Sequence, residues 1–340
     1  MFNLALPVIQ APMAGAQDWA MAAAASNAGG LGSLPCAMLS AEQQRDQAAK
    51  LRQATSGPIN FNYFCHTPPV PDEAAENAWR ALLRPYYREL GLEPDARAPA
   101  AARQPFDEAA CQRVEEVRPE FVSFHFGLPD AALLARVKAT GAKVLASATT
   151  VAEARWLAAR GVDAVIAQGS EAGGHRGMFL SDDIATQIGL FALLPQICAA
   201  VSVPVIASGG IAGPRGVRAA MALGAAGVQV GTAYLFTPEA RITALHAAAL
   251  RGAAAEATAL TRIFSGRPAR GIMNRIMREL GPMNPAAPAF PTAGAAIAPL
   301  RAATEAQGSD EFLQMWSGQA APLCRHDLDT AALTRWLGTL

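Results

Sequence analysis

The chain has 340 residues, with 28 basic and 28 acidic side chains and a formal net charge of zero. Hydrophobic residues make up 51% and charged residues 16%, which excludes an intrinsically disordered chain. The balanced charge, without any run of basic residues, argues against a nucleic-acid-binding protein. This length allows two domains, or one large α/β barrel with additions.

Eight short apolar runs alternate with helical patterns along most of the chain. The predicted strands cover residues 6–14, 30–35, 58–64, 121–126, 143–148, 163–168, 203–208 and 227–231. The helical patterns between them cover residues 18–27, 41–53, 129–140, 151–159, 182–200 and 214–223. Strands that alternate with helices predict βαβ units and a parallel sheet. Eight such units favour a closed (β/α)8 TIM barrel, in the α/β class, over an open sheet.

An insertion interrupts this repeat after the third strand, at residues 66–112. It contains an aromatic helical segment at 79–90 and then a linker rich in proline and alanine at 93–105. Long connections in compact domains are usually lids, binding loops or inserted subdomains. We therefore expect the insertion to lie beside the barrel mouth and to be anchored by large aromatic side chains, which are Trp79, Tyr86 and Tyr87.

The second irregular region begins at about residue 261 and is again rich in proline and alanine. It leads into helices predicted at 310–316 and 330–337. We expect residues 1–260 to form the barrel domain and residues 261–340 to form a C-terminal helical extension that packs on it.

The cysteines and the N-terminal residues indicate the compartment. Five scattered cysteines without a CxxC pair argue against a zinc site or a redox dithiol, and they are typical of reduced thiols. The first ten residues lack the features of a signal peptide. The apolar stretch 216–236 contains Arg218 and Gln229, so it does not favour a membrane span. We expect a cytoplasmic protein that binds no metal, nucleic acid or membrane.

Active-site residues of such barrels follow the C-terminal ends of the strands, and phosphates commonly bind after strands seven and eight. These two loops read ASGGIAG (207–213) and QVGTAYLF (229–236). Their glycines allow close approach to backbone N–H groups, and Thr232 adds a hydroxyl donor. The alternative is that Gly210 and Gly231 only form tight turns.

The loop after strand six, AQGSEAGGHRG (167–177), carries the candidate catalytic residue. The unperturbed pKa of a histidine lies near neutrality, so His175 suits proton abstraction, although a lone histidine can also be structural. Gln168 can bond to the edge of a heterocycle, and Gly173 and Gly174 let the backbone approach a flat ligand.

Other loop residues are less specific. In SFHFG (123–127), His125 lies on the same side of its strand as Ser123, and it either lines the substrate pocket or is a core histidine. We expect Met13 to face the cavity. The segment WSGQAA (316–321) either folds back over the barrel mouth and adds phosphate donors or forms an ordinary turn. We expect three further histidines to lie in solvent, at the linker or on the surface: His66, His246 and His326.

Together these motifs resemble the nitronate monooxygenases, formerly called 2-nitropropane dioxygenases. The segments that carry the resemblance are IQAPMAG, NFNYF, SFHFG, AQGSEAGGHRG, ASGGIAG and QVGTAYLFTPEA. The Gly-Gly-His form and the long insertion resemble class I of that family. The resemblance runs from residue 6 to about residue 319.

The resemblance implies noncovalently bound FMN, with His175 as the catalytic histidine. His125 is a candidate substrate-binding residue from its place at the end of its strand, not from the resemblance. The cofactor contacts carried over onto this sequence are Met13, Asn62, Gln168, Gly173, Gly210, Gln229, Val230, Gly231 and Thr232. The family reaction is FMN-dependent oxidative denitrification of alkyl nitronates such as propionate 3-nitronate. It consumes O2 and forms a carbonyl compound and nitrite. The implied partners are therefore a small nitronate and O2, with a homodimer allowed.

Two other readings remain open. An FMN-dependent NAD(P)H reductase of the enoyl-acyl-carrier-protein or quinone reductase type shares the flavin loops and a loop histidine. A non-catalytic flavin or phosphate binder could use the same scaffold. A barrel similar to inosine-monophosphate dehydrogenase is excluded, because no cysteine lies between Cys111 and Cys198.

Overall fold

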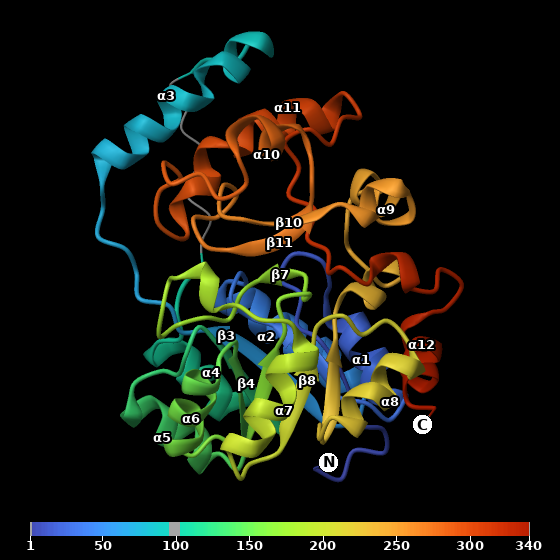
Figure 1. Cartoon of the computed structure of the whole chain (residues 1–340). Coiled ribbons are helices and arrows are strands. Elements are labelled where there is room, and N and C mark those ends of the chain that lie inside the picture. Colours follow the sequence, from blue (N-terminus) through green and yellow to red (C-terminus); the bar gives the residue numbers. More distant parts are fainter. Residues whose placement is uncertain (1, 95–102, 340) are drawn as a thin grey trace.

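Eight parallel strands form a ring in the computed structural model, which describes residues 2–94 and 103–339 (Figure 1). In chain order they are β1 (Val8–Gln10), β2 (Gly32–Pro35), β3 (Ile59–Phe64), β4 (Phe121–His125), β5 (Lys143–Ala148), β6 (Ala164–Gln168), β8 (Val205–Ser208) and β9 (Gly227–Val230). The ring closes between β1 and β2, where Ile9 forms a bridge with Leu31. Each of the eight predicted strands corresponds to one of these, which confirms the predicted TIM barrel.

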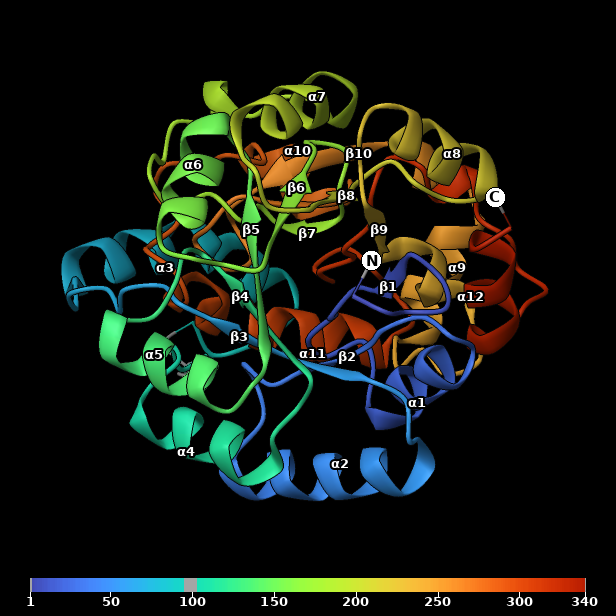
Figure 2. The ribbon, with the colours of Figure 1, turned by 90° about the horizontal axis from the view of Figure 1, so that it is seen from below.

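Helices cover the outside of the ring (Figure 2). They are α1 (Trp19–Asn27), α2 (Ala41–Ala54), α4 (Glu108–Val117), α5 (Ala131–Ala139), α6 (Val151–Ala159), α7 (Leu190–Ala200), α8 (Pro214–Ala222) and α12 (Thr330–Leu337). Polar side chains fix several helix starts: Asp18, Asp130 and Thr150, for example, accept backbone N–H bonds at the N-caps of α1, α5 and α6. The predicted helix at 330–337 is confirmed as α12, which contacts both α1 and α8 and completes this layer.

A small antiparallel sheet lies over one end of the ring (Figure 1). It contains β10 (Thr258–Thr261), β11 (Ala269–Ile272) and β7 (Gly174–His175), in that order. β7 belongs to the loop after β6, so this sheet ties that loop to the C-terminal part of the chain. The sequence patterns did not predict it, because β7 has only two residues and β11 contains Arg270 and Gly271.

The prediction of a helix at 310–316 is wrong. This segment is not helical, and Trp316 instead forms a bridge with Gly271 of β11. The Asn274 side chain donates to the carbonyls of Asp310 and Leu313, at 3.1 and 2.8 Å. These two bonds hold the segment in a non-helical conformation.

The insertion packs on the C-terminal region. Its helix α3 (Glu73–Glu89) confirms the aromatic helical segment, and it lies above the barrel in Figure 1. Trp79 Nε1 donates to the carbonyl of Ala293 at 3.1 Å, and the Tyr87 hydroxyl donates to that of Ala296 at 2.7 Å. The elements around them are α10 (Arg275–Leu280), η4 (Thr292–Ala296) and α11 (Ala298–Ala306), which share a second hydrophobic core with α3. Most of the linker predicted at 93–105 lies outside the described residues.

The remaining elements are short. They are α9 (Ala244–Arg251), η1 (Ile184–Thr186), η2 (Thr232–Phe236), η3 (Ala253–Glu256) and η5 (Ala321–Leu323). Within the described ranges, no helix combines the length and apolar character needed to cross a membrane.

Candidate active site

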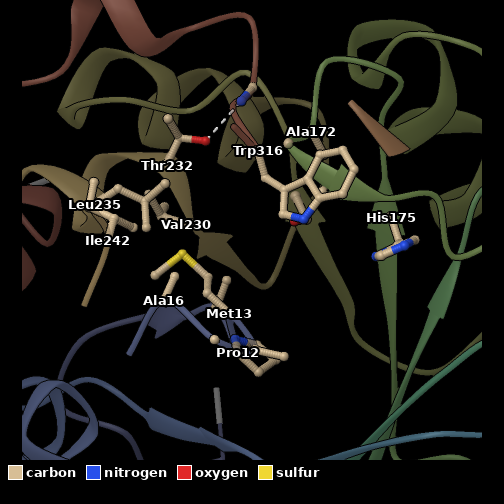
Figure 3. A pocket seen from close by; sticks show the side chains of 18 of the residues that line it. Pro12, Met13, Ala16, Ala172, His175, Val230, Thr232, Leu235, Ile242 and Trp316 are labelled. Carbon is tan, nitrogen blue, oxygen red and sulfur yellow. Dashed lines mark hydrogen bonds between the residues drawn. The ribbon is translucent and has the colours of Figure 1, made fainter. Parts of the chain in front are cut away.

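A cavity of about 460 Å³ opens at the carboxyl ends of the barrel strands. The nine candidate cofactor-binding residues, together with His125 and His175, all line it. Figure 3 shows His175 at one side and Thr232, Val230 and Leu235 at the other, with Met13 and Trp316 also facing the space. The loops singled out in the sequence therefore meet in one place, as the barrel topology requires.

His175 is held through both its backbone and its ring. It lies on β7, where it pairs with Ala269, and its carbonyl accepts hydrogen bonds from Gln168 Nε2 at 3.0 Å and His125 Nε2 at 3.1 Å. The His175 Nε2 atom lies 2.9 Å from the Ser265 hydroxyl. That hydroxyl donates to the Arg267 carbonyl at 3.2 Å, so it accepts from His175. The proton therefore sits on Nε2.

The Nδ1 atom of His175 has no hydrogen-bond partner among the described residues, so its lone pair is available. Burial lowers the pKa of this imidazole well below its ordinary value, and the positive charge of Arg103 lowers it further. The ring is consequently neutral near pH 7, which is the form that can accept a proton.

His125 lines the cavity and is hydrogen-bonded through both ring nitrogens. Its Nε2 donates to a carbonyl, so its Nδ1 accepts from the Ser147 hydroxyl at 3.0 Å. Burial lowers its pKa to about 4. His125 is thus a neutral, fully bonded histidine that lines the cavity and supports the backbone of His175.

Gln168 and Arg176 hold the same loop. Both polar atoms of the Gln168 amide form hydrogen bonds within the protein. Its Nε2 donates to the His175 carbonyl, and its Oε1 accepts from Gly177 N at 2.7 Å. The fully buried Arg176 guanidinium donates to the carbonyls of Gly169 and Gln168, both at 2.6 Å. Sequence reasoning missed Arg176, whose only signal was a charged residue inside a glycine-rich loop.

The glycine loops form the opposite end of the cavity. Gly209 and Gly210 have φ values of +114° and +68°, which side chains rarely adopt. The Gln229 Oε1 atom nearby is buried and has no partner within the described chain, so the structure leaves one acceptor unsatisfied at this cavity.

The segment that contains Trp316 folds back over the cavity, as one of the two readings expected. Gly318 N donates to the Thr232 hydroxyl at 2.9 Å (Figure 3). A Cβ on Gly173 would lie only 2.5 Å from Gly318 N, so Gly173 is required by this close backbone packing. Access for a flat ligand is therefore not the only explanation for a glycine at position 173.

The solvated reading of His66 and the surface reading of His246 are wrong. His66 is 5% exposed and packs edge-on against Phe290, with ring centroids 4.8 Å apart, because the insertion and the extension enclose it. His246 is 7% exposed, lines the cavity and bonds through Nε2 to the Trp316 carbonyl at 3.1 Å. Only His326 is exposed as expected.

The chain matches known proteins along nearly its whole length. A family model described as nitronate monooxygenase matches residues 1–335. The chain is 43% identical to a nitronate monooxygenase of Pseudomonas aeruginosa over 97% of this chain and 95% of the relative. It is 42% identical to one of Paraburkholderia phytofirmans, with coverages of 94% and 88%.

A solved structure gives the same result. The fold matches the nitroalkane oxidase of Streptomyces ansochromogenes with a TM-score of 0.90, 37% identity and coverages of 98% and 95%. These matches confirm the family resemblance and support nitronate oxidation as the activity. The chain is an oxidoreductase that belongs to the nitronate monooxygenase family.

Proposed function

We propose that this enzyme binds FMN and uses O2 to convert alkyl nitronates into carbonyl compounds and nitrite. The observation that carries the proposal is His175, a neutral histidine with a free Nδ1 lone pair, in the same cavity as two glycine-rich loops. The family membership of the chain supports the same chemistry.

The residues present fit FMN. The glycine loops after β8 and β9, with Thr232, suit a phosphate group, because their backbone N–H groups are accessible. The unpartnered Gln229 Oε1 atom could accept an N–H of the flavin ring, and Met13 and Asn62 line the adjoining wall of the cavity. When bound there, FMN would supply the electron acceptor for the nitronate and the electron donor for O2.

The protein's own part is to bind an anion and to hold or move one proton. For a neutral nitroalkane, the proposed step is removal of the α-proton by Nδ1 of His175, with Nε2–H anchored on Ser265. A preformed nitronate has already lost that proton. Positive charge from Arg103 and Arg267 then favours the anionic substrate near His175.

The His175→Asn variant tests this proposal with both substrate forms. Turnover of neutral nitroalkanes should fall about 10²- to 10⁴-fold, the typical contribution of a positioned base. A larger fraction of nitronate turnover should remain, with unchanged flavin content. Equal losses on both forms would contradict the general-base role and leave His175 as a binding residue.

The reductase alternative is tested with the same purified protein. Anaerobic NADH or NADPH should bleach the flavin quickly in a reductase and slowly in a nitronate oxidase. Nitronate-dependent O2 consumption, with nitrite release, then separates the two activities. A protein that holds FMN but gives neither result would support the non-catalytic reading.

A further inference from the structure

Arg267 is a partly buried cation that joins three segments of the chain around His175. It lies in the turn after β10, close to Ser265, whose hydroxyl holds His175 Nε2. Its Nη2 atom donates to the carbonyl of Met178, just beyond β7, at 2.5 Å. Its guanidinium carbon lies 4.2 Å from the centre of the Phe126 ring, directly after β4. One side chain therefore connects the C-terminal extension to the two loops that support the candidate base.

The contact with Phe126 stabilises an unfavourable backbone conformation. The φ of Phe126 is +69°, in the left-handed region that bulky residues rarely adopt, so its surroundings must hold it there. Phe126 directly follows His125, whose Nε2 donates to the carbonyl of His175 at 3.1 Å. The Phe126 ring also lies 6.0 Å from the His175 ring, centroid to centroid. Because Arg267 lies over Phe126, it stabilises both the backbone support and one neighbour of the imidazole.

The positive charge of Arg267 is only partly balanced. Burial lowers the pKa of this guanidinium, and the charges of Asp182 and Glu153 oppose the change without cancelling it. The Nε atom is buried and has no hydrogen-bond partner among the described residues. Buried charges are screened little by water and salt, so the charge of Arg267 acts on the neighbouring rings.

His175 is surrounded by groups that disfavour its protonated form. Burial is the largest cause of its lowered pKa, and Arg103, His125, Arg267 and His66 lower it further, in this order. These groups come from the insertion, the barrel strands and the extension, and no carboxylate is among them. Of the two arginines, Arg267 is the one that also bonds to the loop of His175.

We propose that Arg267 is a positioning residue for His175: its guanidinium holds the loop and the ring that flank the imidazole, and its charge favours the unprotonated base. This inference rests on the proposed function, in which His175 accepts the α-proton of a neutral nitroalkane. Arg267 is not among the residues that line the cavity, so it acts through His175 and not on the substrate. A planar guanidinium suits this double role, since it can lie over an aromatic ring while its N–H groups donate elsewhere.

Two substitutions separate the charge from the contacts. Arg267→Gln keeps an N–H donor near Met178 but removes the charge, whereas Arg267→Lys keeps the charge but loses the planar contact with Phe126. Without the charge, His175 takes up its proton at a higher pH. In Arg267→Gln, the acid limb of kcat/KM for nitroethane should therefore move up by about one pH unit. In Arg267→Lys the limb should keep its wild-type position, and in both variants kcat on the plateau should fall about 10-fold.

A second measurement does not depend on turnover. Nitrogen-15 NMR of the purified enzyme reports the tautomer and the protonation of His175, whose signals are assigned by their absence in His175→Asn. We expect the Nε2–H tautomer in the wild type, and protonation at a higher pH in Arg267→Gln. Arg278→Gln is the matched control, because Arg278 is exposed and its guanidinium also donates to a backbone carbonyl, that of Met273, at 3.3 Å. It should change neither measurement.

The proposal fails if the acid limb and the NMR titration of Arg267→Gln match the wild type, or if Arg267→Lys or Arg278→Gln shifts them equally. A lower thermal unfolding midpoint in Arg267→Gln without a shift of the acid limb would show a merely structural role and would also overturn it. If protonation of His175 depends on Arg267 but no nitroalkane or nitronate is oxidised, the positioning of His175 stands and the proposed function is rejected.

Discussion

Replacing Gly231 with alanine should separate cofactor binding from folding. In the folded protein, a Cβ at this position would lie 3.5 Å from the Ala11 Cβ and 3.7 Å from the Met13 sulfur, which are ordinary contacts. The backbone φ of −113° is negative, so an alanine would not be forced into the left-handed region. The protein alone should therefore accept the new methyl group with a change below about 1 kcal/mol in its free energy of unfolding.

A phosphate bound as proposed should lie directly against the Gly231 backbone. A methyl group there should displace the phosphate and weaken at least one charge-assisted hydrogen bond, worth about 1.5–3 kcal/mol. The expected loss of FMN affinity is about 10- to 150-fold. Titration of the flavin-free protein, followed by quenching of FMN fluorescence, measures the affinity, and thermal unfolding of the same sample measures the fold.

Gly173→Ala is the contrasting variant. Its Cβ would lie 2.5 Å from Gly318 N and 2.6 Å from the Ser317 carbonyl carbon, so the backbone must move. We expect it to destabilise the flavin-free protein by about 1–3 kcal/mol. Similar losses of stability in Gly231→Ala and Gly173→Ala, or an FMN affinity within twofold of wild type in Gly231→Ala, would refute this reasoning.

Three further predictions concern the histidines and the insertion. In Ser265→Ala, His175 loses the acceptor that fixes its proton on Nε2. Turnover of neutral nitroalkanes should therefore fall about 10-fold and its pH profile should shift, whereas the flavin content should stay unchanged. An unchanged pH profile would reject this role of Ser265. Burial lowers the pKa of His66, His125 and His246 to about 4, so the unfolded chain binds more protons below pH 6.5. The free energy of unfolding should therefore fall from pH 6.5 toward pH 4, and calorimetry should show proton uptake on unfolding; a flat profile would contradict it. Trp79→Ala should destabilise the second core by about 3–5 kcal/mol, measured by hydrogen exchange in α3, without changing FMN affinity.

The barrel could be predicted from the sequence because its strands are buried on both faces. Continuous apolar runs such as residues 164–167 of β6 follow directly from that burial. The cavity-lining loops could be located for a related reason, since the carboxyl ends of all parallel strands meet at one end of the ring.

The features that could not be predicted from the sequence depend on contacts between segments that are distant in the chain. His66 and His246 have no local signal for burial, because the residues that enclose them lie far away in the chain, at Phe290 and Trp316. Residues 310–316 contain apolar side chains that are typical of a helix. The Asn274 side chain, however, donates hydrogen bonds to two backbone carbonyls of this segment. Likewise, Ser265 and Arg103 face His175 only after the extension and the insertion have folded over the barrel.

The order of the elements along the chain also has a consequence for biosynthesis. The strands of the ring are complete in the nascent chain once β9 can pair with β1, at Val230. The sheet of β7, β10 and β11 needs residues up to Ile272, and the bond from Gly318 to Thr232 needs almost fifty more. During translation, an open barrel therefore precedes the enclosed cavity, and the cavity is closed on this side only once the segment around Gly318 has left the ribosome.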